Sequence, residues 1–389
     1  MKITKVIIYD VDYGRDFHCR QNPIIVKIET DEGIEGVGEV GLAYGDAAKA
    51  AIGMLKELAS SYFIGADPRR IEYLWDTLFR KSFWGQGGGP VVYGAMSALD
   101  EALWDIKGKW LEVPVYELLG GKMWERIRLY ANGWYAHLVE PREYSEKAQE
   151  VVADGYNALK FDPFAITRQG KYEFPRRFID RDLAKLALAR VRAVREAVGP
   201  DIDIMIEVHG NLGTTAAIEM GRLLEEFKPF FYEEPVDPLN VDALKKVSEN
   251  VKIPIAGGER VYTRYGFRRF IESQALDIVQ PDIGLVGGLT EAKKIAAYAE
   301  TYNLHVQPHN CGGPVATAVA VQFDFCTTNF IIQEWFPYWA DGRYNIITEP
   351  LEFLAKDGYF DISHIEGKPG LGVQLNEDYL ERFNRIVID

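Results

Sequence analysis

The sequence predicts an α/β protein: a (β/α)7β TIM-like barrel with an α+β capping domain built from the N-terminal region and the C-terminal tail. Strand-like runs precede helical patterns in the first 125 residues, and eight apolar runs then alternate with amphipathic stretches. Eight such units in about 210 residues fit a barrel better than an open doubly wound sheet. No dinucleotide-binding fingerprint follows any of the runs, which further disfavours the open sheet.

The capping domain is expected over residues 1–125. The runs 3–13 and 23–40, the second with a turn signal in its middle, predict a meander of antiparallel strands. Apolar residues at three-to-four spacing then predict helices at 47–65, 71–84 and 95–111. The glycine-rich segment Gly85 to Pro90 is predicted to be a turn or a lid, because its glycines disfavour a helix and it lacks the flanks of a phosphate-binding loop.

The barrel is expected over residues 126–345. Its eight predicted strands are short apolar runs that end in polar residues: 126–132, 156–162, 202–210, 230–235, 253–259, 276–282, 304–310 and 330–335. Amphipathic stretches such as 182–199 and 216–227 separate them. The tail, 346–389, is turn-rich and β-like, and we expect it to return to the capping domain.

Composition limits the possible partners and the compartment. A chain of 389 residues that is 47% hydrophobic and carries a net charge of −14, without a Lys/Arg cluster, disfavours nucleic acid and anionic membranes as partners. Cys19, Cys311 and Cys326 are far apart and lack CxxC spacing, which indicates reduced structural thiols. Because the N-terminus lacks a secretory core and no apolar run is long enough to span a membrane, we expect a soluble cytoplasmic protein.

Three glutamates end consecutive predicted strands at a constant interval. Glu207, Glu233 and Glu259 are 26 residues apart, about one strand-plus-helix unit, so a parallel array brings their carboxylates to one end of adjacent strands. Clustered anions repel each other unless a cation lies among them. An oxygen-only ligand set with no cysteine nearby favours Mg²⁺ over zinc, and we predict an Mg²⁺ site here.

Two of the six histidines stand where predicted strands end. His209 lies two residues after Glu207, and His309 follows the seventh run. Asp282 ends the sixth run, so it is the expected neighbour of His309 around the barrel. An aspartate that bonds one ring nitrogen leaves the other free to take a proton, as in an oriented general base. The alternative is that Asp282 only caps the following helix.

The strand-end motifs EVHGN, YEEP, GGER, QPD and QPHN, in this order, resemble those of the enolase superfamily. The resemblance covers essentially the whole chain, including DEGIEGVGE and SALDEALWDIKGKWLEVPVYELLGG in the capping domain. The segment ALKFDPF after YANGWY is similar to sugar-acid dehydratases of the gluconate and galactonate type. The superfamily uses a Lys or His base with one or two Mg²⁺ ions against an enediolate.

The resemblance implies a metal centre and a base. Glu207, Glu233 and Glu259 would hold Mg²⁺. His309 with Asp282 would remove the proton α to the substrate carboxylate. One departure is that the first metal ligand is a glutamate, where aspartate is common in the family.

The resemblance also implies an acid and substrate contacts. His209 would protonate the departing β-hydroxyl, and Glu334 would hydrogen-bond the substrate carboxylate or the enediolate. Lys160 and Asp162 are predicted to be further substrate-binding residues. Family racemases commonly have a second lysine where Asp162 stands, and beside Asp162 we expect Lys160 to pair with it or to bind a substrate oxygen. The implied reaction is the Mg²⁺-dependent dehydration of an aldonate or aldarate, such as gluconate or galactonate, to a 2-keto-3-deoxy sugar acid.

Two other functions remain open. A racemase or epimerase acting α to a carboxylate would share the metal and the enediolate, with Lys160 as its second base. A non-catalytic sugar-acid-binding protein would keep the barrel and lose the chemistry. The choice of sugar acid depends on the capping loops around 42–46 and 83–90, and Lys160, Arg260 or Arg15 could meet a distal carboxylate. We expect a small-molecule sugar acid as the partner, and a homo-oligomer, because Trp and Tyr side chains of the first domain would suit a subunit contact.

Overall fold

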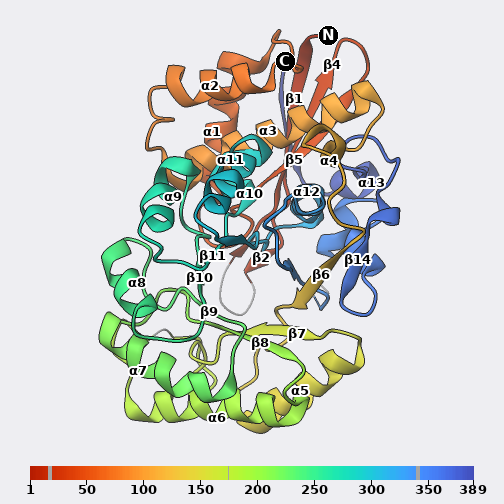
Figure 1. The fold of residues 1–389 in the computed structure, drawn as a ribbon. Coiled ribbons are helices and arrows are strands. Elements are labelled where there is room, and N and C mark those ends of the chain that lie inside the picture. Colours follow the sequence, from red (N-terminus) through yellow and green to blue (C-terminus); the bar gives the residue numbers. More distant parts are fainter. Residues whose placement is uncertain (16–19, 174, 339–341) are drawn as a thin grey trace.

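The capping domain contains an antiparallel sheet in which the two ends of the chain meet. The computed structural model describes residues 1–15, 20–173, 175–338 and 342–389. The sheet has the order β15-β1-β4-β5 and is formed by β1 (Ile3–Asp10), β4 (Ile24–Thr30), β5 (Glu35–Val40) and β15 (Asn384–Ile388). Because β15 pairs with β1, the tail returns to the capping domain as predicted, and the two termini lie side by side in Figure 1.

Helices cover this sheet, and the longest of them touches the strand backbone. The helices are α1 (Ala48–Leu58), continued by the π-helical turn η1 (Ala59–Phe63), α2 (Ile71–Lys81) and α3 (Gly89–Leu111). A Cβ on Gly36 would lie 2.2 Å from the carbonyl oxygen of Ala102, and one on Gly38 would lie 2.1 Å from that of Ala98. Glycines at alternate positions of β5 therefore allow the close approach of α3.

The glycine-rich segment Gly85–Pro90 is only partly a turn. Helix α3 begins at Gly89 with Pro90 in its first turn, rather than at Ala95 as predicted. Proline is well suited to this position because the first N–H groups of a helix have no helical partner. Most of α3 is buried, and burial of an apolar helix contributes more stability than propensity at its first residues.

The barrel consists of eight parallel strands in the described part of the chain. They are β6 (Arg126–Ala131), β7 (Ala158–Phe161), β8 (Asp203–Glu207), β9 (Phe231–Glu233), β10 (Ile255–Gly257), β11 (Ile278–Val279), β12 (His305–Val306) and β13 (Gln333–Trp335). Their order is β12-β11-β10-β9-β8-β7-β6-β13, and the bridge between Val306 and Phe330 joins the two ends into a closed barrel. All eight lie within the predicted runs.

Helices connect these strands on the outside of the barrel (Figure 1). They are α5 (Pro141–Ala153), α6 (Arg181–Val198), α7 (Thr214–Leu224), α8 (Val241–Ser248), α9 (Thr263–Glu272), α10 (Ile283–Val286), α11 (Gly288–Glu300) and α12 (Pro314–Asp324). A 3-10 turn, η2 (Glu225–Phe227), extends α7, and the short α4 (Val115–Leu118) leads into β6. The (β/α)7β prediction is confirmed, with α10 and α11 sharing one connection.

The strand period places the polar residues directly above an apolar layer. Tyr130, Met205 and Phe231 belong to a buried cluster with one residue from each of several strands. Successive side chains of a strand alternate between its faces, so residues two positions later point the same way. Glu207 follows Met205 and Glu233 follows Phe231 at this interval. The interior is thus filled with apolar side chains up to the carboxyl ends of the strands.

The rest of the chain contains mostly short elements. These are β2 (Gly14–Arg15), β3 (Arg20–Gln21), η3 (Arg343–Ile346), η4 (Leu351–Leu354), β14 (Tyr359–Asp361), η5 (Ile362–His364) and α13 (Glu377–Leu380). The tail is therefore less β-like than predicted, although β14 pairs with β6. Cys19 lies outside the described residues. Neither Cys311 nor Cys326 forms a disulfide with another described residue.

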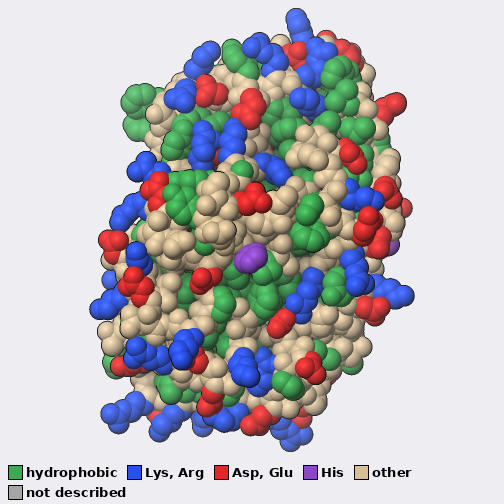
Figure 2. All heavy atoms as spheres, viewed as in Figure 1, with side chains coloured by type: hydrophobic (Ala, Val, Ile, Leu, Met, Phe, Trp, Pro, Cys, Tyr) green, Lys and Arg blue, Asp and Glu red, His purple; other side chains and the backbone are tan. Residues whose placement is uncertain are grey.

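The surface carries charges of both signs. Figure 2 shows Lys and Arg side chains interspersed with Asp and Glu over the face in view, without a continuous basic area there. In the described parts of the chain, none of the helices has the length and apolar character needed to span a bilayer.

Candidate active site

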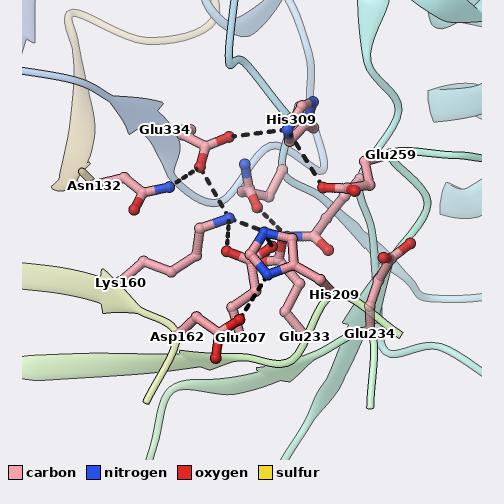
Figure 3. A network of polar contacts seen from close by, with 12 residues as sticks. Asn132, Lys160, Asp162, Glu207, His209, Glu233, Glu234, Glu259, His309 and Glu334 are labelled. Carbon is pink, nitrogen blue, oxygen red and sulfur yellow. Dashed lines mark hydrogen bonds and ion pairs between the residues drawn. The ribbon is translucent and has the colours of Figure 1, made fainter. Parts of the chain in front are cut away.

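Three buried glutamates meet at the carboxyl ends of β8, β9 and β10. Glu207 and Glu233 are paired residues at the ends of neighbouring strands, and Glu259 follows β10 by two positions. One carboxylate oxygen of each lies within 4.8 Å of the others, and all three side chains are buried. The structure thus brings together the three residues predicted as metal ligands (Figure 3).

Lys160 contacts this cluster from β7. Its Nζ lies 2.8 Å from Glu233, 2.9 Å from Glu334 and 3.4 Å from Glu207. The expected pairing with Asp162 is not found among the described contacts. The reason is that the chain turns after β7, where one Asp162 oxygen accepts the backbone N–H groups of Phe164 and Ala165. Although burial opposes its charge, the surrounding carboxylates raise the pKa of Lys160.

His209 stands between two carboxylates in a strained turn. Its Nδ1 is 2.7 Å from Oδ2 of Asp162, and its Nε2 is 3.0 Å from Oε1 of Glu207. Burial opposes protonation, but Glu207 and Asp162 together raise the pKa of His209 well above its usual value. The backbone φ of His209 is +53°, a conformation that non-glycine residues adopt rarely and mostly at functional or tightly constrained sites.

His309 and Asp282 form the predicted pair. Nδ1 of His309 is 2.7 Å from Oδ2 of Asp282, and the two residues also form a parallel backbone bridge. Asp282 precedes α10, but its side chain makes no capping hydrogen bond there. Nε2 of His309 faces the cluster, 3.4 Å from Glu259 and 3.9 Å from Glu334. Burial lowers the pKa of His309, yet these carboxylates outweigh it and raise the value to about 10.

Glu334 is the middle residue of β13, and its carboxylate contacts both Lys160 and the loop that carries His309. Its Oε1 accepts a hydrogen bond of 2.7 Å from the amide of Asn132, and its Oε2 accepts one of 2.8 Å from the backbone N–H of Asn310. Burial would raise the pKa of Glu334, but Lys160 and His309 lower it. In Figure 3, Glu334 lies beside His309, while His209 lies over Glu207.

Comparison with known proteins defines the family. Residues 14–120 match the family model of the mandelate racemase / muconate lactonizing enzyme N-terminal domain, and residues 143–379 match that of the enolase C-terminal domain-like family. The chain belongs to the enolase superfamily. Members of this superfamily use a divalent metal ion, and the buried glutamate cluster is where this chain would hold one.

Similar proteins in this superfamily are named dehydratases. The chain is 36% identical to D-galactonate dehydratase of Xanthomonas campestris, over 99% of this chain and 94% of that protein. It is 32% identical to D-gluconate dehydratase of Thermoproteus tenax, over 98% and 73% of the two proteins. A crystal structure of an enolase-superfamily member from Salmonella Typhimurium is 43% identical, with 100% of both chains covered and a TM-score of 0.94. The protein is thus a lyase of the enolase superfamily.

Several residues around the enolase-type cluster were not singled out from the sequence. Nε2 of Gln280 donates to Oε2 of Glu233 at 2.9 Å, and the buried carboxylate of Glu234 pairs with Arg260. Glu234 has a positive φ of 40° directly after Glu233. The signal that could have found Gln280 and Glu234 is their place inside the short strand-end motifs QPD and YEEP, where every polar residue lies near the barrel axis.

The arginines considered for a distal carboxylate differ in their environments. Arg260 forms an ion pair with Glu234, and its Nε lies 3.5 Å from Oε1 of Glu259. Arg15 is largely exposed and pairs with Asp46 at 2.9 Å. Tyr44 belongs to the predicted capping loop 42–46. Burial raises the pKa of its hydroxyl, and nearby charges of the site raise it further, chiefly that of Glu259.

Proposed function

We propose that this protein dehydrates a sugar acid, an aldonate or aldarate such as gluconate or galactonate, to a 2-keto-3-deoxy sugar acid in an Mg²⁺-dependent reaction. One observation carries the proposal: two Asp–His pairs, Asp282–His309 and Asp162–His209, both face a single buried cluster of three glutamates. An acid and a base at one metal centre are what elimination of water α,β to a carboxylate requires. The names of the relatives support the substrate class.

The glutamate cluster fits a hard divalent cation. Its ligand atoms are carboxylate oxygens only, and Glu334 adds a fourth buried carboxylate beside the cluster. The ammonium of Lys160 contacts three of these four, Glu207, Glu233 and Glu334. This excess of negative charge, without a nitrogen or sulfur ligand in the cluster, favours Mg²⁺. When bound, the cation would supply positive charge that stabilises the enediolate of the substrate, commonly the largest catalytic contribution.

His309 is the proposed general base. Asp282 accepts a hydrogen bond from Nδ1 and so leaves Nε2, which faces the cluster, as the nitrogen that takes the α-proton. The bonding electrons move toward the substrate carboxylate and form the enediolate. Glu334, which accepts N–H groups from Asn132 and Asn310, is the proposed hydrogen-bonding partner of that carboxylate or enediolate, and it must carry a proton in the complex to donate this bond.

His209 is the proposed general acid. Its two carboxylate partners favour the protonated ring, and hydroxide leaves only when it is protonated to water. Proton transfer to the β-hydroxyl breaks the carbon–oxygen bond, and the resulting enol becomes the 2-keto acid. Asp162 was predicted to bind substrate. Because its described contacts reach His209 and backbone N–H groups, we propose that it orients His209 instead.

Lys160 is proposed to bind the substrate carboxylate through its ammonium. Three carboxylates surround it, so it is held in the charged form. A racemase would need Lys160 as a neutral second base, and this environment opposes that state.

The experiment is a screen of aldonic and aldaric acids with the purified protein and Mg²⁺, with detection of 2-keto acid by semicarbazone absorbance. We expect one or more acids to be dehydrated. His309→Asn should abolish α-proton exchange with D₂O and lower turnover by about 10²–10⁴-fold, whereas His209→Asn should abolish water loss and can leave exchange intact. Exchange without water loss in the wild type would indicate a racemase. Tight binding of a sugar acid without exchange or product would indicate a binding protein.

We further propose that the protein forms a homo-oligomer. Phe83 and Trp84 of the capping domain are 73% and 72% exposed, and Tyr73 of α2 is 48% exposed. Large exposed apolar side chains are common at subunit contacts. Light scattering on the eluting protein would give the mass, and a monomer that is unchanged by concentration would contradict this proposal.

A further inference from the structure

We propose that Glu39 of the capping domain is a positioning residue for His309: its buried carboxylate holds the segment that carries this histidine. The role of His309 as the base rests on the proposed function. The anchoring of the segment does not, because it follows from contacts between β5 and the N-terminus of α12.

Both oxygens of Glu39 are used by the barrel. Oε1 accepts the backbone N–H of Gly313 at 2.5 Å, and Oε2 accepts that of Ala316 at 3.0 Å. Glu39 is fully buried, and a Cβ on Gly313 would lie only 2.9 Å and 3.0 Å from its two oxygens. A carboxylate at the first turn of a helix compensates N–H groups that have no partner within the helix. This carboxylate comes from the other domain.

The held segment begins at His309 and is short. Asn310, the next residue, donates its backbone N–H to Glu334, and its side chain donates to Oγ1 of Thr317 in the first turn of α12. The backbone between His309 and α12 therefore has little freedom once Gly313 is fixed. A displacement of Gly313 therefore also displaces the imidazole of His309. Its hydrogen bond from Nδ1 to Asp282, 2.7 Å long, depends on the present position of the ring.

The chain that follows β5 also contacts the segment after Asp282, the partner of His309. Just past β5, the N–H of Gly41 donates to the carbonyl of Gly284 at 2.9 Å, and a Cβ on Gly41 would lie 2.8 Å from Oδ1 of Asp282. Within the capping domain, Glu101 of α3 accepts the N–H of Glu39 at 2.9 Å. The capping domain thus contacts the segments after both Asp282 and His309, from outside the barrel.

The burial of Glu39 argues for a requirement beyond domain docking. A buried carboxylate is expensive unless hydrogen bonds compensate it, and apolar side chains of similar size hold domains together at lower cost. What an apolar side chain lacks is the ability to fix two N–H groups in one direction. That ability matters where a displacement of about 1 Å can lower a rate by roughly 10²-fold.

The test compares Glu39→Gln with a matched control, Asp105→Asn. Asp105 is also a fully buried carboxylate of the capping domain that accepts two backbone N–H groups, from Val37 at 2.9 Å and Leu371 at 2.8 Å. Its partners lie away from His309 along the chain. We expect Glu39→Gln to lower kcat roughly 10- to 100-fold with KM within about twofold of the wild type. Asp105→Asn should lower Tm but leave kcat unchanged.

A second variant addresses the same contact from the barrel side. Gly313→Ala places a methyl group against the Glu39 carboxylate without changing charge, and the backbone at Gly313 (φ −86°) accepts alanine. We expect it to lower kcat as well, and the double variant to lose less than the product of the two single losses, because both remove one interaction. Multiplicative losses would overturn the proposal, as would equal kcat changes in Glu39→Gln and Asp105→Asn.

Hydrogen exchange separates this proposal from the proposed function. Backbone amides in 310–317 should exchange faster in Glu39→Gln than in the wild type or Asp105→Asn. If the wild type dehydrates no sugar acid, the proposed function fails, and the exchange rates alone decide whether Glu39 anchors the segment. Unchanged exchange in Glu39→Gln would overturn the anchoring.

Discussion

His309 shows how one side chain depends on the charges around it. Its pKa is raised to about 10, because Glu259, Asp282 and Glu334 outweigh the effect of burial. A general base must be neutral to accept a proton. The nearest of these carboxylates to Nε2 is Glu259, at 3.4 Å, which is also a proposed metal ligand. Binding of a divalent cation and loss of the His309 proton are therefore linked.

This linkage predicts that Mg²⁺ binding releases protons at pH 8. A cation that neutralises Glu259 lowers the pKa of His309, so a ring that is protonated in the metal-free protein becomes neutral. Calorimetry in two buffers of different ionisation enthalpy measures the number of protons released. His309→Asn should bind Mg²⁺ with fewer protons released than the wild type, and equal release in both proteins would contradict the linkage.

Among the elements, the barrel strands and the polar residues at their carboxyl ends could be predicted best from the sequence. The eight apolar runs each contain a barrel strand, and the glutamates and histidines that follow them converge at one end. Period-two alternation and parallel pairing are enough for this result, because they determine which face a residue occupies and at which end of the strand it lies. The family resemblance added the role of each residue.

Individual partners within the site could not be predicted in the same way. Lys160 and Asp162 are two residues apart, yet the first contacts the glutamates and the second turns to His209. Whether the chain continues as a strand or turns after Phe161 decides between these contacts, and one sequence does not specify that turn. The contact between Glu39 and α12 joins residues 274 positions apart, which no local pattern indicates.

The start of α3 illustrates the limit of local propensity. The glycines of the segment 85–90 predict a turn, whereas the helix already begins at Gly89. Packing of α3 against β5 determines the helix, and the close contact at Gly36 and Gly38 shows how tight that packing is. Tertiary contacts contribute more to a buried helix than the propensity of its ends.

This packing predicts that Gly38→Ala is strongly destabilising. A Cβ at this position would lie 2.1 Å from the backbone carbonyl of Ala98, so α3 must move away from β5, at a cost of roughly 1–3 kcal/mol or more. Urea unfolding of this variant, of a control variant and of the wild type measures the three free energies of unfolding. The control is Gly53→Ala in α1, where the added Cβ meets no atom within 4 Å apart from the nearby backbone of its own helix. Alanine should be neutral there or stabilise by up to about 1 kcal/mol. Similar changes in both variants would show that backbone contact at Gly38 is not what matters.

At the scale of the whole molecule, buried carboxyl groups link stability to pH. Burial raises the pKa of Asp100, which contacts Thr290 of α11 from α3, and that of Glu352 in the tail, each to about 7. Both groups bind a proton more tightly in the folded chain than in the unfolded chain. Between the usual carboxyl pKa and pH 7, the folded state therefore carries more protons, and its stability must fall as the pH rises.

We accordingly expect the free energy of unfolding to decrease between pH 5 and pH 7, by up to roughly 1.4 kcal/mol per pH unit for each such group. Above pH 7 this contribution is constant. Urea unfolding at several pH values measures the slope, and Asp100→Asn should make it shallower. A stability that rises with pH over this window, or an unchanged slope in Asp100→Asn, would contradict the assignment.

The most direct test of the account is the metal requirement of the reaction. Protein treated with a chelator should dehydrate no sugar acid, and activity should return when Mg²⁺ is added back to the wild type but not to Glu233→Gln. That result is expected because the three clustered carboxylates from adjacent strands are the proposed metal ligands. Full activity in chelator-treated protein, or equal recovery in Glu233→Gln, would contradict it.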